Sequence, residues 1–396
     1  MTSAAELDAA DVLAEHRSLF VRADDVTAYL DGNSLGRPLK ASGERIAAFV
    51  EAQWGGRLIR GWDESWLALP GRIGDDLGRV ALGAGSGQLT IGDSTTVLLY
   101  KLIRGAVAAR PGRTEIVIDR DNFPTDRYIV EGIAAELGMT VCWIDAGDAV
   151  TTEAVAAAVG ANTAAVILSH VAYRSGYVAD AAGITSVAHD VGALIVLDLC
   201  HSVGVVPVEL DAWGVDLAVG CTYKYLNGGP GAPAFAYVRA DLQGELRQPI
   251  QGWIGSAAPF EMGQGYQPAT GIRGFLSGTP PIIGMLAMQD MIALIESVGL
   301  TAVRSKSVAL TTFAIELSDD LLPDAALATP RDPALRGGHI TLDHPRFAEL
   351  VPRLWARGVI PDFRRPSGLR LGLSPLSTSF SEVEAGIRAI AEELAR

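Results

Sequence analysis

Short apolar runs of strand length alternate with helix-length amphipathic stretches through the middle of the chain. The apolar runs at 115–119, 139–144, 164–168, 193–197, 217–220 and 234–238 are each typical of a buried strand. Helical patterns lie between the earlier runs, at 125–137, 151–159 and 181–191. Strands that alternate with helices predict an α/β fold built of βαβ units around a mainly parallel sheet. Such a sheet binds ligands at the carboxyl ends of its strands.

The pattern changes after about residue 285. A long apolar helical pattern at 282–298 is followed by a further helix, a strand near 339–342, a helix at 345–357, a strand near 369–373 and a final amphipathic helix at 381–394. A chain of 396 residues is too long for one ordinary core. We therefore expect a large domain at 61–285 and a smaller α+β domain at 286–396. The N-terminal segment at 1–60 is expected to contribute to the small domain and to the functional site.

Charge and composition exclude several classes of protein. The formal net charge is −14, and no basic stripe offsets it, so the chain is expected to repel nucleic acid and anionic membranes. The N-terminus lacks the basic flank and apolar run of a secretory signal, and no stretch reaches the roughly 18 apolar residues of a membrane span. Cys142, Cys200 and Cys221 lie in apolar surroundings, which favours free thiols in a reducing compartment. We expect a cytoplasmic protein that binds neither nucleic acid nor membrane.

An acid and a lysine follow two consecutive apolar strands. Asp198 ends the first strand, where it could equally cap the next turn. Lys224 follows the second, between Tyr223 and Tyr225 and before the glycine-rich loop at 228–231. Glycine permits left-handed backbone and a close approach to a ligand. A surface lysine before a turn is the alternative interpretation, but it would not need this setting.

Together the two residues fit the chemistry of pyridoxal 5'-phosphate. A lysine that binds a carbonyl covalently must spend time deprotonated, and partial burial favours that state. A carboxylate that pairs with a pyridine nitrogen keeps this nitrogen protonated, so that the ring can accept electrons. Asp198 and Lys224 are separated by enough chain for one turn, one crossover and one strand.

The segment at 92–96 could bind the phosphate of this cofactor. It reads Gly-Asp-Ser-Thr-Thr and opens a helical pattern that runs towards Arg104. Small hydroxyl residues at a helix N-terminus are well suited to bind phosphate, although an ordinary helix cap has the same pattern. The sequence has no P-loop, and its histidines lack the spacing of metal ligands, so we expect no metal.

Seven motifs lie in a constant order along nearly the whole chain, at 30–36, 123–126, 198–202, 223–231, 252–255, 278–281 and 369–375. The most specific of them is Tyr-Lys-Tyr-Leu-Asn-Gly-Gly-Pro-Gly at 223–231. In identity and order they resemble the motifs of the kynureninase family. The resemblance implies a fold-type-I pyridoxal-phosphate enzyme that works as a homodimer with active sites at the interface.

The resemblance also implies roles around the cofactor. Lys224 would hold the cofactor and move protons, Asp198 would pair with its ring nitrogen, and Phe123 would stack on the ring. The remaining implied contacts are Asp126 and His201 beside the ring, Thr95, Thr96, Ser169 and Tyr223 at the phosphate or ring edge, and Trp253 and Thr279 from the partner subunit. Phe123 and Trp253 also suit plain core or interface aromatics.

On the substrate side, the resemblance implies hydrolysis of L-kynurenine to anthranilate and L-alanine in tryptophan catabolism. Arg370 would bind the substrate carboxylate, because its planar fork meets a carboxylate bidentately. It could instead pair with a structural acid. Asn33 and Ser34 would lie near the substrate, and Tyr223 is a candidate proton relay.

Two features concern substrate choice. Ser256 stands where many family members have histidine. Thr279, together with Trp62, resembles the bacterial branch, which prefers kynurenine and takes 3-hydroxykynurenine as a secondary substrate. A site without a partner for the extra hydroxyl should not favour it.

Other functions stay open at this stage. An aminotransferase, an inactive binding protein of the same fold and a variant acting on a substituted kynurenine all remain compatible with the motifs. A cysteine desulfurase is disfavoured, because it needs a catalytic cysteine late in the chain and none follows Cys221.

Overall fold

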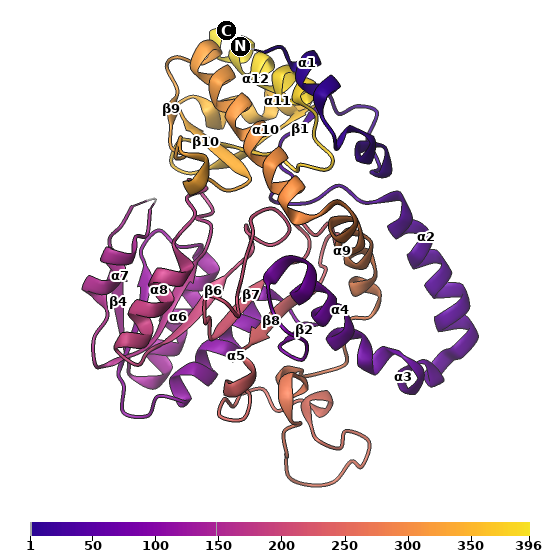
Figure 1. Cartoon of the computed structure of the whole chain (residues 1–396), viewed down its shortest axis with the longest axis vertical. Coiled ribbons are helices and arrows are strands. Elements are labelled where there is room, and N and C mark those ends of the chain that lie inside the picture. Colours follow the sequence, from indigo (N-terminus) through magenta and orange to yellow (C-terminus); the bar gives the residue numbers. More distant parts are fainter. Residues whose placement is uncertain (1, 148) are drawn as a thin grey trace.

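The computed structural model describes residues 2–147 and 149–396, and a seven-stranded sheet forms its centre (Figure 1). The strand order is β2-β8-β7-β6-β5-β3-β4. Strands β3 to β7 run parallel to one another, whereas β8 is antiparallel to both of its neighbours. The strands are β2 (Leu89–Gly92), β3 (Glu115–Asp119), β4 (Thr140–Ile144), β5 (Thr163–Ser169), β6 (Leu194–Asp198), β7 (Leu217–Gly220) and β8 (Ala234–Val238). The mainly parallel sheet and its six predicted strands are confirmed, and β2 is an additional strand.

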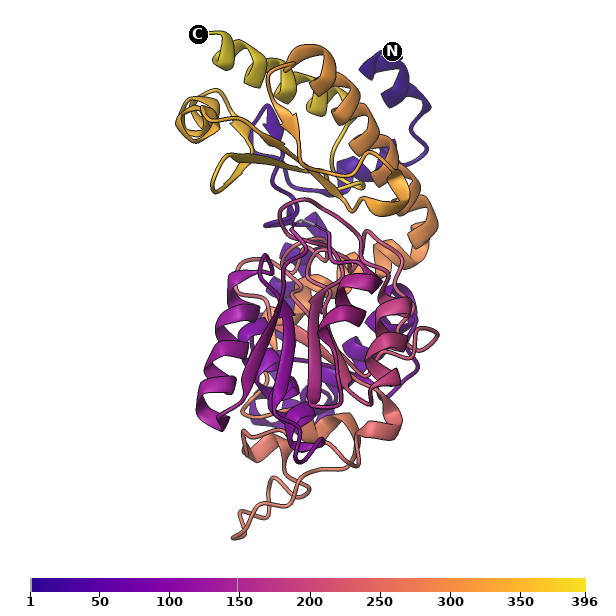
Figure 2. The same ribbon diagram turned by 90° about the vertical axis from the view of Figure 1, so that its left-hand side faces the viewer.

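Helices cover both faces of this sheet (Figure 2). Helices α5 (Thr95–Ala108) and α6 (Pro124–Leu137) pack on one face, against side chains such as Ile116 and Ile118. The other face, which includes Val117, is covered by α4 (Leu69–Leu77), α7 (Thr152–Ala158), α8 (Ala181–Asp190) and α9 (Leu286–Val298). Because both faces are buried, the central strands are apolar at nearly every position.

A second core lies at the other end of the molecule. Its sheet has the order β12-β13-β10-β9, from Asp362–Arg364, Gly368–Gly372, His339–Asp343 and Ala326–Leu327. It packs with α10 (Leu300–Leu321), α11 (Phe347–Ala356) and α12 (Phe380–Ala395). The N-terminal segment joins it, because α1 (Ala4–Ala10) lies beside α12 and β1 (Ala28–Tyr29) pairs with β11 (Val359–Ile360). Figure 1 shows both termini together on this domain. The boundary at 285 remains a prediction, and α9 beyond it packs on the large-domain core.

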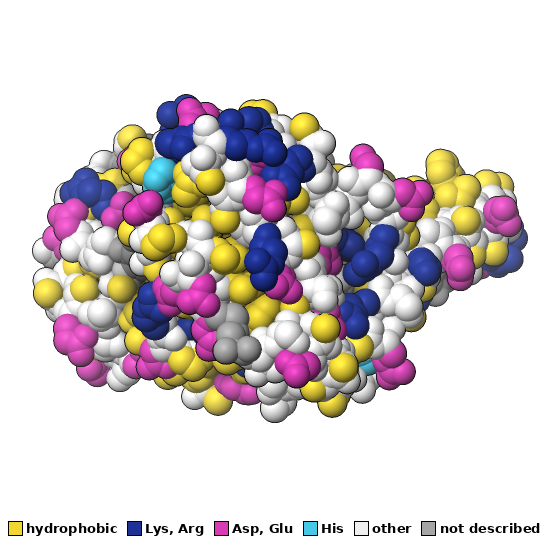
Figure 3. Space-filling model, turned by 90° about the horizontal axis from the view of Figure 1, so that it is seen from above, with side chains coloured by type: hydrophobic (Ala, Val, Ile, Leu, Met, Phe, Trp, Pro, Cys, Tyr) yellow, Lys and Arg dark blue, Asp and Glu magenta, His cyan; other side chains and the backbone are white. Residues whose placement is uncertain are grey.

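Residues 40–68 form an arm that projects from the large domain. The arm consists of α2 (Lys40–Ala48), a π-helix (Phe49–Gly55), a 3-10 turn (Leu58–Arg60), α3 (Gly61–Glu64) and a second 3-10 turn (Trp66–Ala68). The side chain of Ile59 on it is 77% exposed. A second projecting segment, at 250–270, carries Met262, which is 75% exposed. Figure 3 shows the arm leaving the body of the molecule with apolar side chains at its far end.

Short helical turns complete the described chain. They are 3-10 turns at Ala14–Leu19, Ala240–Leu242, Trp253–Gly255, Gly271–Phe275, Ile283–Met285 and Pro333–Leu335, and a π-turn at Gly78–Leu82. No single helix of the described residues is long and apolar enough to cross a membrane. The segments Ile283–Val298 and Leu300–Leu321 reach that length and composition only as a pair bent by 92°.

Candidate active site

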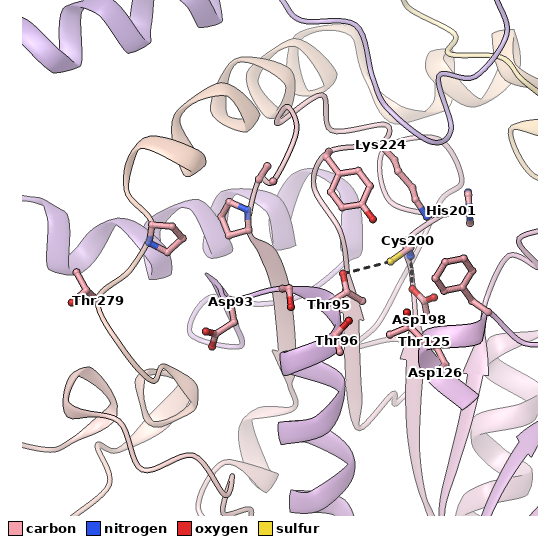
Figure 4. Close-up of a pocket in the computed structure, with 17 residues that line it drawn as sticks. Asp93, Thr95, Thr96, Thr125, Asp126, Asp198, Cys200, His201, Lys224 and Thr279 are labelled. Atoms are coloured by element: carbon pink, nitrogen blue, oxygen red, sulfur yellow. Dashed lines mark hydrogen bonds between the residues drawn. The ribbon is translucent and has the colours of Figure 1, made fainter. Parts of the chain in front are cut away.

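A cavity of about 510 Å³ opens at the carboxyl ends of β6 and β7 (Figure 4). This is the edge at which a parallel sheet is expected to bind a ligand. The predicted site residues that line it are Thr95, Thr96, Phe123, Asp126, Asp198, His201, Tyr223, Lys224 and Thr279. They come from segments far apart in the sequence, so the fold brings most of the predicted cofactor contacts together.

Lys224 differs from every other lysine of the chain. Lysine occurs at positions 40, 101, 224 and 306. Lys101 and Lys306 are buried and paired with Asp93 and Asp11, and Lys40 is exposed. Lys224 is buried at the cavity wall and has no ion-pair partner in the part of the chain that the structure describes. A lysine held there without a carboxylate is suited to act as a nucleophile.

The amine of Lys224 contacts an imidazole and an aromatic ring. Its Nζ lies 3.1 Å from Nε2 of His201 and 5.8 Å from the centroid of the Phe123 ring. Burial lowers the pKa of His201 well below its usual range, and the positive charges of Lys224 and Arg370 lower it further. The imidazole is therefore neutral, and its Nε2 accepts the hydrogen bond from Lys224.

Two acids lie side by side at the floor of the cavity. Asp198 ends β6, and its carboxylate accepts a hydrogen bond of 2.7 Å from the backbone N–H of Cys200. Neither carboxyl oxygen of the buried Asp126 has a partner among the described residues. Burial raises the pKa of Asp126 well above its usual range, and the adjacent Asp198 and Asp119 raise it further. The hydrogen-bonded Asp198, next to a buried acid whose pKa is raised, suits a cationic partner such as a protonated ring nitrogen.

The N-terminus of α5 forms another part of the cavity wall, beside Asp198 and Cys200 (Figure 4). Ser94 caps this helix by accepting a hydrogen bond from the N–H of Val97, and Thr95 and Thr96 form its first turn. Asp93 before the cap has a φ of 48°, and its carboxylate pairs with the buried Lys101. The helix N-terminus thus presents hydroxyl and amide groups to the cavity, which is a suitable arrangement for a phosphate.

Tyr223 lines the cavity next to Lys224, and two buried thiols lie close to it. Burial raises the pKa of the Tyr223 phenol, and the neighbouring Cys221 and Cys200 raise it further. The phenol therefore keeps its proton at neutral pH. It can donate a hydrogen bond or a proton, but it is a poor base.

Ser169, Trp62 and Trp253 do not line the cavity, and neither do the predicted carboxylate-binding residues. Ser169 donates a hydrogen bond of 2.8 Å to Oδ1 of Asn122 and lines a small neighbouring pocket. Trp62 packs edge-on against Trp66 in the arm, with 5.3 Å between ring centroids. Trp253 is 40% exposed in the projecting segment at 250–270. Their roles as cofactor or substrate contacts remain predictions. Thr279 lies at the rim of the cavity of its own chain, so its contribution to a partner's site also remains a prediction.

The predicted substrate residues form a second group, close to the cavity but not part of its wall. Arg370 on β13 is 1% exposed, and its NH2 group donates a hydrogen bond of 2.6 Å to Oγ of Ser34. Asn33 is fully buried, and its side-chain amide has no partner among the described residues. The positive charge of Arg370 acts on His201 and on the fully buried His339, whose rings lie 5.4 Å apart. This contact connects the group to Lys224.

The segment at 30–37 is held against the loop that carries Lys224. The N–H of Gly36 donates a hydrogen bond of 2.9 Å to the carbonyl of Tyr223, and Asn227 binds the carbonyl of Arg37 at 2.6 Å. A Cβ atom on Gly36 would lie 2.4 Å from the carbonyl oxygen of Lys224. Only glycine fits this position, so the N-terminal segment and the lysine loop form one unit.

Comparison with known proteins identifies the family. A model described as the kynureninase C-terminal domain matches residues 303–390, and one described as aminotransferase class-V matches residues 93–345. The chain is 39% identical over 399 residues to the kynureninase of Pseudomonas fluorescens, covering 98% of this chain and 94% of that relative. The chain belongs to the kynureninase family. A Burkholderia pseudomallei kynureninase (strain K96243) is also 39% identical over 401 residues, with the same coverage.

Solved structures with the same fold are more distant in sequence. A cysteine desulfurase from Thermococcus onnurineus NA1 superposes with a TM-score of 0.81 at 18% identity, over 96% of this chain and 97% of that chain. A C-DES mutant with glycine covalently linked to its PLP cofactor has a TM-score of 0.84 at 19% identity, over 95% and 99% of the two chains. The fold-type-I architecture and the resemblance to kynureninases are both confirmed.

Like other kynureninases, this chain depends on pyridoxal 5'-phosphate, and the cavity fits the cofactor. Lys224 offers an amine that has no carboxylate partner in the described part of the chain, and Asp198 with Asp126 offers acidic groups for the ring nitrogen. The N-terminus of α5 offers a phosphate site beside them.

Some functional side chains escaped the sequence patterns. Asp31 and Asp362, which approach Arg370, and His339, which packs on His201, were not predicted. Asp31 lies inside the motif at 30–36, so its position was a usable signal. His339 and Asp362 lie on strands of the small domain, and their distance from the cavity depends on how the two domains pack.

Proposed function

We propose that this chain hydrolyses the Cβ–Cγ bond of L-kynurenine to give anthranilate and L-alanine, as a cytoplasmic homodimer in tryptophan catabolism. The observation that carries the proposal is Lys224, whose amine lines a cavity without an ion-pair partner among the described residues, with acids at one wall and a helix N-terminus at another. Family membership over nearly the whole chain supports the choice of substrate.

Each residue of the site has a distinct task in this reaction. Pyridoxal phosphate, when bound, supplies an electron sink for the charge that develops on the substrate α-carbon. Lys224 would hold the cofactor, and its amine would move the proton of the substrate α-carbon. His201 accepts a hydrogen bond from the lysine amine and so limits the directions in which it can turn. Asp198 holds the ring nitrogen in its protonated form.

Two further groups act on the substrate. Tyr223 keeps its phenol proton and lines the same cavity as Lys224, so it can donate a proton to the reacting groups there. Arg370 binds the substrate carboxylate, with Asn33 and Ser34 next to it. Trp62 and Thr279 favour kynurenine over its 3-hydroxy form in this proposal.

Exposed apolar side chains support the homodimer with shared active sites. They lie on the arm (Trp54, Leu58, Ile59) and on the segment at 250–270 (Trp253, Phe260, Met262). Large exposed apolar side chains gathered on projecting segments are typical of interaction surfaces.

The experiment is to incubate the cofactor-loaded protein with L-kynurenine and to measure anthranilate and alanine. We expect equal amounts of the two products without any added keto acid, faster than with 3-hydroxykynurenine, and none from Lys224→Ala. The match to aminotransferase class-V makes amino transfer the second candidate function. Consumption of kynurenine only when α-ketoglutarate is present, without anthranilate, would establish amino transfer instead.

A further inference from the structure

Four charged side chains meet where the N-terminal segment crosses β12 and β13. Arg370 NH2 lies 2.7 Å from Oδ2 of Asp362 and 3.9 Å from Oδ1 of Asp31. The same Asp362 oxygen accepts a hydrogen bond of 2.6 Å from Nε of Arg364. Asp362 and Arg370 are direct neighbours across the two strands, so this contact is fixed by the register of the sheet.

Two atoms of this cluster are buried without a hydrogen-bond partner among the described residues. They are Nε of Arg370, a donor, and Oδ1 of Asp31, an acceptor. The two terminal nitrogens of Arg370 are already engaged, because NH1 donates to the carbonyl of Tyr173 and NH2 to Ser34. A carboxylate ligand could therefore accept a hydrogen bond from Nε of Arg370. It would, however, lie beside the carboxylates of Asp31 and Asp362.

The charges of the cluster balance only without a ligand. Arg364 and Arg370 offset Asp31 and Asp362, so a bound carboxylate would leave one uncompensated negative charge in a largely buried place. Leaving such a charge buried is costly, and protonation of a nearby acid removes the cost. Asp362 contacts both arginines, Arg364 through a hydrogen bond and Arg370 through an ion pair. Asp31 only approaches Arg370, at 3.9 Å.

We propose that Asp31 takes up a proton when a carboxylate ligand binds Arg370, and that Asp31 thereby sets the pH range in which the site accepts its amino-acid substrate. The inference rests on the proposed function, because it assumes that the substrate carboxylate binds Arg370. Beyond the role of Arg370, the inference assigns proton uptake to Asp31 and predicts that carboxylate binding depends on pH.

The surroundings of Asp31 single it out as the group that titrates. The pKa of Asp31 is raised to about 6, mainly by burial and also by Asp362, while Ser34, Arg370 and Arg364 act in the opposite direction. Burial also raises the pKa of Tyr29 to about 12 and raises that of Tyr225, so both phenols stay neutral. The pKa values of His201 and His339 lie well below the usual range, so both rings stay neutral as well.

The sign of the effect follows from this value. Below about pH 6 Asp31 is already protonated, so a carboxylate binds without proton uptake. Above that pH Asp31 is ionised in the free protein, and a new negative charge next to it raises its pKa. Binding then takes up a proton, and the affinity falls by up to about tenfold for each pH unit until the pKa of the bound state is passed.

The test is calorimetric titration of the holoenzyme with the desamino analogue of kynurenine, 4-(2-aminophenyl)-4-oxobutanoate. This ligand keeps the carboxylate, the aryl ketone and the aromatic amine, but it lacks the α-amine that would react with the cofactor. Titrations in two buffers of different ionisation heat give the number of protons taken up. We expect none below pH 6 and close to one per ligand above it, with weaker binding at high pH.

Two variants complete the design. Asp31→Asn should remove the proton uptake and make the affinity nearly independent of pH, tighter than wild type at high pH. Asp324→Asn, an exposed acid in a turn, removes the same charge elsewhere and should behave as wild type. Binding without proton uptake in the wild-type protein would overturn the role of Asp31 alone. Absence of binding to the wild-type protein, or binding that Arg370→Lys leaves unchanged, would overturn the proposed carboxylate site together with it.

Discussion

Asp126 and Asp198 lie next to each other at the floor of the cavity, but their contacts differ. Asp198 is held by a backbone N–H at a strand end, and this donor stabilises a carboxylate. Asp126 is fully buried and lacks a partner among the described residues, and its pKa lies well above the usual range. Two carboxyl groups so close cannot both ionise easily, so one of them serves as the charge and the other as a neutral neighbour.

This difference predicts unequal effects of the same substitution. Asp126→Asn replaces a neutral acid by a neutral amide, so we expect cofactor affinity within about tenfold of wild type, a change of about 1.4 kcal/mol. Asp198→Asn removes the charge that keeps the ring nitrogen protonated, and we expect turnover to fall at least about a hundredfold. Cofactor titration followed by absorbance, with kcat measured alongside, compares the two. Equal losses in both variants would contradict the assignment of roles.

At the scale of elements, the site depends on two segments that are distant in sequence. The segment at 30–37 lies on the loop that follows β7, and Gly36 is the point of closest approach to Lys224. The pairing of β1 with β11 and the burial of Leu30 in the small domain hold the same segment from the other side. The segment therefore contacts both the small domain and the loop that carries Lys224, and it links the two.

Gly36→Ala tests this coupling. The added methyl would lie 2.4 Å from the carbonyl oxygen of Lys224 and 2.5 Å from Cγ of Asn227, so the loop must move. We expect a loss of about 1–3 kcal/mol in the free energy of unfolding, together with weaker cofactor binding.

Gly43→Ala is the matched control. Its methyl would meet nothing within 4 Å, and glycine inside helix α2 is unfavourable, so stability should rise by about 0.5–1 kcal/mol. Thermal melts with and without cofactor give both quantities. A Gly36→Ala protein that melts and binds cofactor like wild type would exclude close packing at this point.

How far the sequence predicts this fold depends on the kind of element. The strands buried on both faces are continuous apolar runs, and they were predicted to within about two residues. Strand β2 (Leu89–Gly92) was missed because it is short and directly follows a glycine-rich turn. The antiparallel direction of β8 has no local signature, since a buried strand looks the same in either direction.

The site shows the same division. Residues at strand ends and helix N-termini, such as Asp198 and Thr95, were predicted because the sheet fixes where those positions lie. Asp362 escaped because its contact with Arg370 depends on the register of β12 against β13, and His339 escaped because its contact with His201 arises from the packing of one domain on the other. That packing is not encoded in any local pattern of apolar and polar residues.

At the scale of the whole molecule, the proposed dimer determines which chain completes each cavity. The exposed apolar side chains of the arm and of the segment at 250–270 lie on parts of the chain that project from the body (Figure 1). The sequence-based prediction assigns Trp253 and Thr279 to the partner's site, whereas Thr279 also lines the cavity of its own chain.

Subunit mixing distinguishes these arrangements. One inactive variant carries Lys224→Ala, and the other carries Trp253→Ala with Thr279→Ala. If the partner supplies Trp253 and Thr279, mixed dimers regain one intact site, so about a quarter of the sites in a random mixture become active. If each chain completes its own cavity, mixing restores nothing. Sedimentation of the mixture confirms that dimers have exchanged.

Every step proposed for the chain passes through Lys224, and the most direct measurement identifies the lysine that carries the cofactor. The holoenzyme is reduced with borohydride, digested and analysed by peptide mass. We expect the mass of the reduced cofactor on the peptide that contains Lys224, and none on the peptides that contain Lys40, Lys101 or Lys306. Cofactor on any of these three lysines, or on no lysine, would contradict the site and the chemistry assigned to it.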